Sequence, residues 1–171
     1  MTIFGMANLQ TTQTYLRNPG DPDTSTWYVA HRFSFMAEGR DTGGAFTLLD
    51  TLVRRGFEPP PHTHRDEDEA YLVIDGEATF RSGGDVHEAG PGSFVWLPRH
   101  VGHSFALHTE TARMVILMSP SGLEDAFREC SRPAATLDLP VVPAGPPSQE
   151  DIVLWNHAFE SRGVVFAPPP V

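Results

Sequence analysis

Short apolar segments, most of them bounded by a glycine or a proline, recur from residue 27 to residue 118 of this 171-residue sequence. The chain contains 16 prolines and 15 glycines, which are poorly tolerated inside long helices and central strands. Short segments separated by turn residues are typical of an antiparallel sandwich or barrel, so we predict an all-β fold. The expected strands are residues 27–36, 45–54, 70–74, 78–81, 93–97, 104–108 and 112–118.

Glycine-containing pairs mark the expected turns between these strands. Asp75-Gly76 lies between two apolar runs and predicts a tight hairpin that joins them. Gly83-Gly84 and Gly90-Pro91-Gly92 mark two further turns.

The sequence changes from strand-like to helical after Met118. Ser121 with Glu124, and Ser148 with Asp151, both match the spacing of a helix capping box. Apolar residues then recur at helical spacing, as Leu123, Ala126, Phe127 and Cys130 and later as Ile152, Trp155 and Phe159. We therefore predict a single domain over 1–171, with a β-barrel core over 20–118 and a C-terminal helical and proline-rich extension over 119–171.

Composition and charge exclude several functional classes. The formal net charge is −10 and the 12 Lys and Arg residues are scattered, so nucleic acid is not an expected partner. The N-terminal MTIFGMANLQ lacks the features of a signal peptide, and the apolar run 114–118 is too short to cross a membrane. Cys130 is the single cysteine, so no internal disulfide forms, and we expect a buried, inert thiol. A cytoplasmic protein without membrane contact is expected.

The segment 56–76, GFEPPPHTHRDEDEAYLVIDG, carries the strongest chemical signal. His62 and His64 are two residues apart, so in a strand both imidazoles point to one face and can share an ion. Glu69 has the wrong parity for the same face of an unbroken strand, so the acidic run 65–68 is expected to be a register-resetting turn. Beyond that turn Glu69 and Tyr71 would face inward. Two histidines and one carboxylate are the ligand set of non-haem iron sites.

The acidic neighbours of Glu69 leave one alternative open. Asp66, Glu67 and Asp68 are expected to be solvated in the turn, although Asp68 could replace Glu69 as the ligand. A fourth ligand is suggested by His103, which opens the strand after a proline-bearing turn. If that strand is antiparallel to the first, His103 reaches the same ion.

At this point the sequence resembles the cupin superfamily. The first cupin motif, G-x5-H-x-H-x4-E-x6-G, is matched at all its fixed positions, which are Gly56, His62, His64, Glu69 and Gly76. In the second motif, G-x5-P-x-G-x2-H-x3-N, Gly92, Pro98 and His103 match, whereas His100 and Leu107 replace the glycine and the asparagine.

The resemblance implies a cupin jelly-roll β-barrel in which His62, His64, Glu69 and His103 bind one divalent transition metal. Iron, manganese, nickel, cobalt, copper and zinc all accept such ligands, so the identity of the metal stays open. The helical tail is similar to that of single-domain bacterial cupins related to quercetinases. This similarity implies a dioxygenase acting on a phenolic or enolisable small molecule, with Glu69 as ligand and base. A non-catalytic ligand-binding cupin, or an isomerase, decarboxylase or polyketide cyclase, remains an alternative.

Several other side chains carry weaker expectations. Tyr71, Phe94, Trp96 and Phe105 either line a substrate pocket or fill the barrel. His100 is expected in an exposed turn, and His31, His87, His108 and His157 are expected to be surface or structural residues. The apolar segment 27–36 and the proline-rich extension offer surface that one barrel does not cover, so we expect a homodimer.

Overall fold

The computed structural model describes residues 13–167, so the N-terminal MTIFGMANLQ and Pro168-Pro169-Pro170 lie outside the described residues. Its elements, in chain order, are β1 (Ser25–Tyr28), β2 (His31–Ala37), α1 (Gly39–Thr42), β3 (Thr47–Arg54), β4 (His62–His64), β5 (Asp68–Asp75), β6 (Ala78–Ser82), β7 (Asp85–Ala89), β8 (Phe94–Leu97), β9 (His103–Leu107), β10 (Thr111–Ser119), α2 (Glu124–Glu129), β11 (Arg132–Pro133), α3 (Gln149–Glu160) and β12 (Val164–Phe166).

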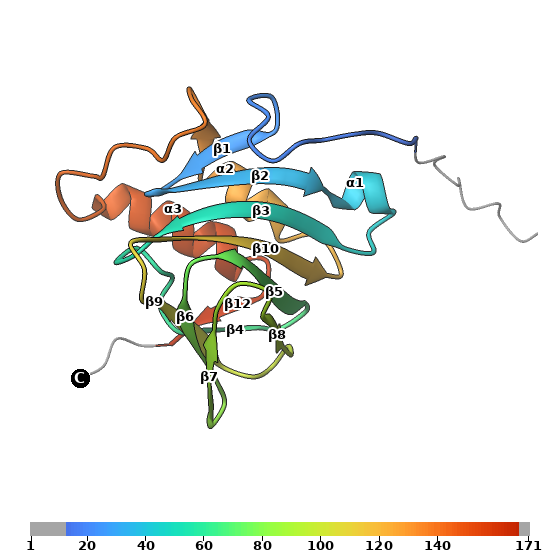
Figure 1. The fold of residues 1–171 in the computed structure, drawn as a ribbon. Coiled ribbons are helices and arrows are strands. Elements are labelled where there is room, and N and C mark those ends of the chain that lie inside the picture. Colours follow the sequence, from blue (N-terminus) through green and yellow to red (C-terminus); the bar gives the residue numbers. More distant parts are fainter. Residues whose placement is uncertain (1–12, 168–171) are drawn as a thin grey trace, which may run out of the picture.

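Two antiparallel sheets form the body of the molecule (Figure 1). One sheet has the order β11-β1-β2-β3-β10-β5-β8, and the other has the order β12-β4-β9-β6-β7. Both sheets mix strands that are distant in the sequence, as expected for a jelly roll, so the predicted fold class is confirmed.

Alternation of buried and exposed side chains explains why the sheets face each other. All nine residues of β10 alternate strictly between buried and half-buried positions. The inward residues of β2, β3 and β10 include Phe35, Leu49 and Met114, all fully buried. Each such side chain contributes about 1.5–3 kcal/mol by leaving water. The barrel interior is therefore the main hydrophobic core.

Two predictions about local structure were wrong. Residues 27–36 form two strands, β1 and β2, which are separated by a turn in which Val29 has a φ of 54°. Asp75-Gly76 is not a hairpin, because β5 and β6 belong to different sheets. Gly76 has a φ of 89°, and a Cβ there would lie 2.7 Å from the Thr111 carbonyl oxygen. Glycine is needed because the chain crosses between sheets close to β10.

The two predicted capping boxes had different outcomes. The Ser148–Asp151 box is present at the start of α3. The box at Ser121 is not, since α2 begins at Glu124 without a side-chain cap. The Glu124 carboxylate instead accepts hydrogen bonds from the Gly39 and Gly122 backbone amides and the Thr47 hydroxyl. It therefore ties α2 to α1 and β3.

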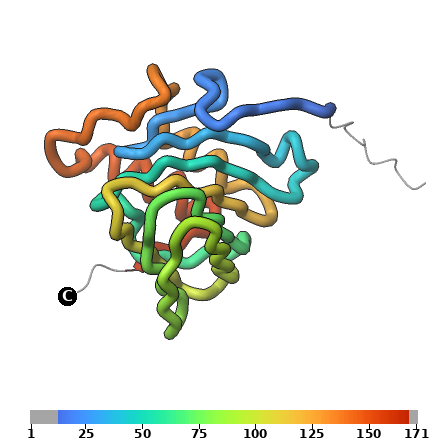
Figure 2. The backbone as a smooth tube through the Cα atoms, in the orientation of Figure 1, coloured from blue at the N-terminus to red at the C-terminus, as the bar shows by residue number. Residues whose placement is uncertain are grey.

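The C-terminal segment contributes to both sheets, which was not predicted. β11 pairs with β1, and β12 pairs with β4 in the register Val164↔His64 and Phe166↔His62. In the backbone trace the red C-terminal chain lies beside the teal chain of β4 (Figure 2). Helix α3 lies between these strands in sequence and packs on the open end of the barrel. Among the described residues, no helix has the length and apolar character needed to cross a membrane.

Candidate metal centre

Strand β4 brings two histidines to one face, as the sequence predicted. The side chains of His62 and His64 are buried, whereas Thr63 between them is half-buried. The strand is held on one side by β12 and on the other by β9. The three preceding prolines keep the approach to β4 extended and deliver His62 at the start of the strand.

His103 lies directly opposite His62 across the antiparallel β4–β9 pair. The ring centroids of His62 and His103 are 4.5 Å apart. The rings of His64 and His103 are stacked, with centroids 5.3 Å apart and an interplanar angle of 7°. The predicted antiparallel arrangement is therefore present.

Glu69 reaches the histidines from the other sheet. β5 begins at Asp68, and Glu69, Tyr71 and Val73 point into the barrel. Oε2 of Glu69 is 3.3 Å from Nε2 of His103 and 3.7 Å from Nε2 of His64. Its other oxygen, Oε1, accepts a hydrogen bond of 3.2 Å from the Tyr71 hydroxyl. One carboxylate oxygen thus faces the imidazoles, while the other is fixed by Tyr71.

These four side chains, His62, His64, Glu69 and His103, form what we call the metal-binding cluster. One donor atom from each lies within 4.8 Å of every other, and all four residues are buried. Nδ1 of His62 and Nδ1 of His103 each lie within hydrogen-bonding distance of a backbone oxygen, of Pro60 at 2.9 Å and Val101 at 3.1 Å. If both Nδ1 atoms carry the ring proton, each Nε2 has its lone pair free.

Unpartnered polar atoms show that the cluster fits an ion. Nε2 of His64, Nε2 of His103 and Oε2 of Glu69 are buried and have no hydrogen-bond partner. Buried polar atoms without partners are costly, and a cation among three imidazoles and a carboxylate would satisfy all of them. The cluster can therefore hold one metal ion, with the borderline N and O ligands that divalent transition metals accept.

Burial and charge set the protonation of the cluster. Burial lowers the pKa of His62 to about 4, which keeps this imidazole neutral and able to bind a metal. Burial opposes ionisation of Glu69, but its contact with His103 and the neighbouring imidazoles hold the pKa of Glu69 below its usual value. Burial, then the adjacent Glu69, raise the pKa of Tyr71 well above 10, so its hydroxyl stays a donor.

The acidic run before Glu69 does not behave as one solvated turn. Arg65 and Asp66 are exposed and pair with each other at 2.9 Å. Asp68 points outward and accepts hydrogen bonds from Arg99, which lower the pKa of Asp68 to about 2. The geometry thus places Glu69, and not Asp68, in the cluster.

Glu67 is the residue of this run that sequence reasoning placed wrongly. Its side chain is only 6% exposed, and Oε2 lies 3.7 Å from Nδ1 of His64. Burial favours neutral His64, but Glu67 and then Glu69 outweigh it and raise the pKa of His64. The sequence could not show that Asp66 is exposed and Glu67 buried, because all four residues of the run 65–68 are charged and none differs in polarity.

The remaining histidines lie outside the cluster. His100 is exposed in a turn, with a φ of 67°, which explains why the family motif has glycine at this position. His31 is buried and structural, since its ring nitrogens contact the Phe57 oxygen and the Arg54 amide. His87, His108 and His157 are exposed. Cys130 is half-buried and not buried as predicted, and burial raises the pKa of its thiol to about 11, so the thiol is protonated at neutral pH.

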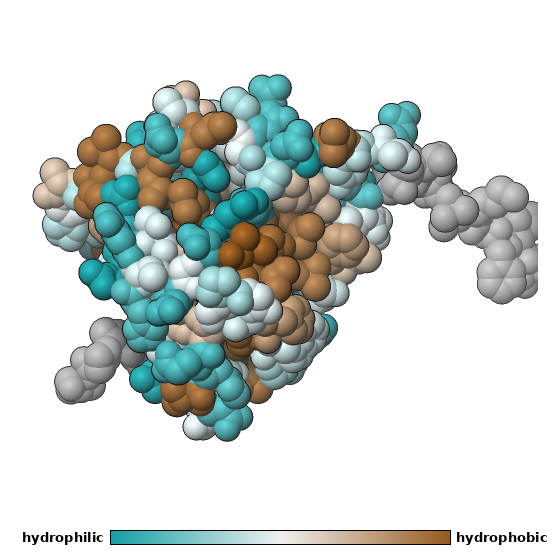
Figure 3. Space-filling model, viewed as in Figure 1, coloured by the Kyte–Doolittle hydropathy of each residue, from teal (hydrophilic) through white to brown (hydrophobic). Residues whose placement is uncertain are grey.

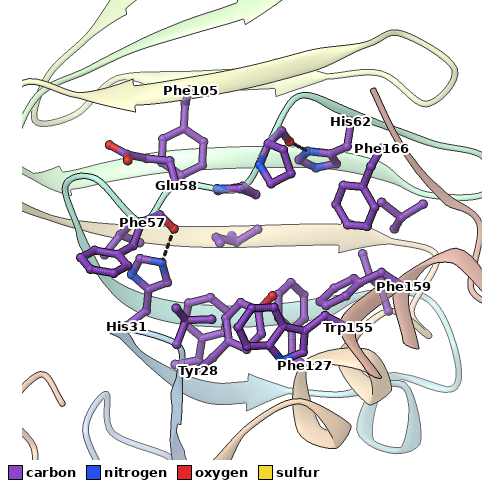
Figure 4. A pocket seen from close by; sticks show the side chains of 18 of the residues that line it. Tyr28, His31, Phe57, Glu58, His62, Phe105, Phe127, Trp155, Phe159 and Phe166 are labelled. Carbon is purple, nitrogen blue, oxygen red and sulfur yellow. Dashed lines mark hydrogen bonds between the residues drawn. The ribbon is translucent and has the colours of Figure 1, made fainter. Parts of the chain in front are cut away.

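A cavity of about 340 Å³ opens onto the metal-binding cluster. Its walls include His62, His64 and Glu69, and the rest of its lining is largely apolar, with Tyr, Phe and Trp side chains at nine positions. Figure 4 shows His62 and Phe105 on one side of the cavity and a layer of Tyr28, Phe127, Trp155 and Phe159 on the other. Helix α3 provides two of these aromatic residues, so the C-terminal extension forms one wall of the site.

The four aromatic residues singled out in the sequence fall into two groups. Tyr71 and Phe105 are buried and line the cavity. Phe94 and Trp96 point away from the barrel, with exposed fractions of 63% and 50%. The prediction that all four line a pocket or fill the barrel was therefore wrong for the β8 pair, whose parity directs both side chains outward.

Comparison with known proteins supports the resemblance to the cupin superfamily. Residues 50–120 match the family model described as a cupin domain. This segment contains all four residues of the metal-binding cluster. Over 98 residues, the chain is 26% identical to quercetin 2,3-dioxygenase of Bacillus subtilis, which covers 57% of this chain but only 29% of that protein. The chain therefore spans less than a third of that relative.

Solved structures agree on the fold. Ectoine synthase from P. lautus superimposes with a TM-score of 0.53 at 22% identity, covering 72% of this chain and 87% of the other. An RmlC-like cupin from Shewanella frigidimarina gives a TM-score of 0.50 at 18% identity, covering 57% of this chain and 85% of the other. Both support the fold and leave the reaction undetermined.

Proposed function

Because this chain is a member of the cupin superfamily, we propose that it is a metal-dependent enzyme whose ion is held by the metal-binding cluster. The observation that carries the proposal is the set of buried, unpartnered Nε2 and Oε2 atoms at the end of an apolar cavity. When bound, a divalent ion would act as a Lewis acid for an anionic oxygen donor.

The chain's own residues would divide the remaining work. The cavity opening admits a small molecule, and the aromatic walls would exclude water and hold a planar ring. Glu69 would stay ionised and accept the proton of a substrate hydroxyl as it approaches the cluster. Tyr71 would hold the Glu69 carboxylate in place through Oε1, which leaves Oε2 directed at the imidazoles.

The preferred substrate is a phenolic or enolisable small molecule, and the preferred reaction is dioxygenation. The similarity to quercetin 2,3-dioxygenase supports this choice, together with a largely apolar cavity to which Tyr, Phe and Trp side chains contribute at nine positions. Its volume of about 340 Å³ is within the range of small-ligand sites. Glu69 at the cluster end suits a substrate with one acidic oxygen, and the largely apolar remainder of the lining suits an apolar body.

Oxygen consumption separates this reaction from the alternatives. The protein should be purified without chelator or metal-affinity resin, analysed for metal, and then screened for oxygen uptake with flavonols, diketones and phenols. We expect about one ion per chain and uptake that needs both ion and substrate. Substrate turnover without oxygen uptake would instead indicate an isomerase, decarboxylase or cyclase. Saturable binding without any turnover would indicate a ligand-binding cupin.

We also propose that the chain forms a homodimer through the outer face of the seven-stranded sheet. Apolar residues gather over β3, β10 and β5 on this face (Figure 3). The outward side chains are Leu48, Leu72, Ile74, Phe94, Trp96, Val115 and Leu117, and the central charged residues Asp50 and Arg113 are paired at 2.9 Å. In a chain of net charge −10, a mostly apolar face whose central charges are paired allows two copies to meet with little like-charge repulsion.

A further inference from the structure

The three histidines of the metal-binding cluster differ in what their second ring nitrogen faces. Nδ1 of His62 and of His103 each lies close to a backbone oxygen two residues earlier in the chain. Nδ1 of His64 has no such partner and is buried. The polar atom that faces it is Oε2 of Glu67, at 3.7 Å, which is also buried and unpartnered.

Among the described residues, the Glu67 side chain forms no hydrogen bond and no ion pair apart from its contact with His64. Its neighbours are engaged elsewhere, because Asp66 pairs with Arg65 and Asp68 pairs with Arg99. A buried carboxylate without a cation or a hydrogen bond is strongly destabilising. The buried position of the Glu67 carboxylate therefore needs an explanation. The group that its buried oxygen faces is the His64 imidazole.

We propose that Glu67 is the positioning residue for His64. The Glu67 carboxylate accepts a hydrogen bond from the Nδ1 proton of His64 when Nε2 of His64 binds the ion. The present separation is longer than a hydrogen bond. Binding of a cation at Nε2 makes the Nδ1 proton a stronger donor, which favours closing this gap. Glu67 fixes the tautomer and the ring plane of His64, and its charge offsets part of the ion's charge in a buried site. The proposal rests on the metal centre proposed above.

Two variants of Glu67 and one matched control test this role. Glu67→Ala removes the acceptor, and Glu67→Gln keeps an oxygen acceptor but removes the charge. Asp66→Asn is the matched control, because it removes the charge of an exposed carboxylate that is one residue away from Glu67. Zinc dissociation constants, measured by competition with a chromophoric chelator, should rise about 10–100-fold for Glu67→Ala. The increase should be smaller for Glu67→Gln and absent for Asp66→Asn.

A second measurement reads the His64 ring directly. Long-range ¹H–¹⁵N spectra of the zinc-loaded wild type should show His64 protonated at Nδ1, with this proton protected from exchange. Glu67→Ala should lose that protection, while the His62 and His103 signals stay unchanged. If Glu67→Ala does not fold, Glu67→Gln carries the test through the same two measurements.

Several results would overturn the proposal. Equal zinc affinity and equal His64 spectra in all variants would remove the positioning role. X-ray absorption data that place two carboxylates on the zinc would make Glu67 a ligand instead. A wild type that binds no zinc or other divalent ion would overturn the proposed metal centre together with this inference, whereas the first two results leave that centre intact.

Discussion

His62 and His103 lie opposite each other on neighbouring antiparallel strands, with ring centroids 4.5 Å apart, although 41 positions separate them in the sequence. This pairing turns two separate motifs into one cluster, because each Nδ1 faces backbone and each Nε2 faces the barrel interior.

Paired substitution His62→Ala and His64→Ala should abolish metal binding while the fold persists. Both imidazoles are proposed ligands on one short strand, whereas the barrel core is apolar and includes none of the four cluster residues. Metal content by mass spectrometry should fall from about one ion per chain to none, with an unchanged far-ultraviolet circular dichroism spectrum. The exposed His87→Ala is the matched control. Full metal occupancy in the double variant would contradict the assignment.

Glu69→Gln should reduce turnover much more than metal affinity. Three imidazoles remain as ligands, but the carboxylate loses its basicity, and a positioned base contributes about 10²–10⁴-fold. Asp68→Asn is the neighbouring control, because Asp68 points outward to Arg99 and should leave both properties nearly unchanged. An active Glu69→Gln and an inactive Asp68→Asn would reverse the assignment. If both are silent, the site is a three-histidine centre.

The metal-free protein should lose stability as the pH falls from about 6.5 to 4. The folded pKa of His62 is about 4, below the unfolded value of about 6.5, so the unfolded state binds more protons in this window. The contribution of His62 is complete above pH 6.5 and is lost on acidification. Burial also lowers the pKa of His31, which acts with the same sign. His64, with a raised pKa, is protonated in both states below 6.5 and adds little slope there.

Thermal unfolding of chelator-treated protein at pH 7, 6 and 5 measures this effect. In the His62→Gln variant the side chain at position 62 does not titrate. This variant should therefore show a weaker fall in the midpoint temperature on acidification than the wild type. Equal slopes for the two proteins would mean that His62 is solvated and that burial does not lower its pKa.

Gly163→Ala should destabilise the protein and weaken metal binding. Gly163 has a φ of 88°, and an added Cβ would lie 2.8 Å from Oδ2 of Asp66. Its carbonyl accepts a hydrogen bond of 2.9 Å from the Arg65 amide, which fixes β12 beside β4. The left-handed backbone alone costs a non-glycine residue about 1–2 kcal/mol. Chemical denaturation and zinc titration measure both effects, and Gly145→Ala, at an open site, should be neutral.

The double variant Phe94→Ser and Trp96→Ser should convert the proposed dimer to a monomer. Both side chains are half exposed or more on the outer sheet face, where their removal deletes the largest apolar contact area. Sedimentation velocity at micromolar concentration should show the change in mass. Val153→Ser, on the exposed side of α3, is the control. A monomeric wild type would contradict the proposed interface, and loss of mass in the control would move it to α3.

Most of the cluster could be predicted because its information is local. The two-residue spacing of His62 and His64 fixes a common face, and strand parity after the turn correctly directed Glu69 and Tyr71 inward. Only the pairing of His103 with His62 required the assumption that two strands are antiparallel neighbours. The all-β fold likewise follows from the lengths of the apolar runs and from the glycines and prolines between them.

The tertiary structure decided the features that depend on contacts between distant segments. Asp75-Gly76 has the composition of a hairpin, yet the jelly-roll path sends its two strands into different sheets. The burial of Glu67 depends on tertiary contacts, because Glu67 faces His64 whereas its two acidic neighbours pair with arginines. The pairing of β12 with β4 and the aromatic wall from α3 join residues about 100 positions apart. Sequence patterns record the period and polarity of a segment, whereas packing against a remote partner selects among the arrangements that those patterns allow.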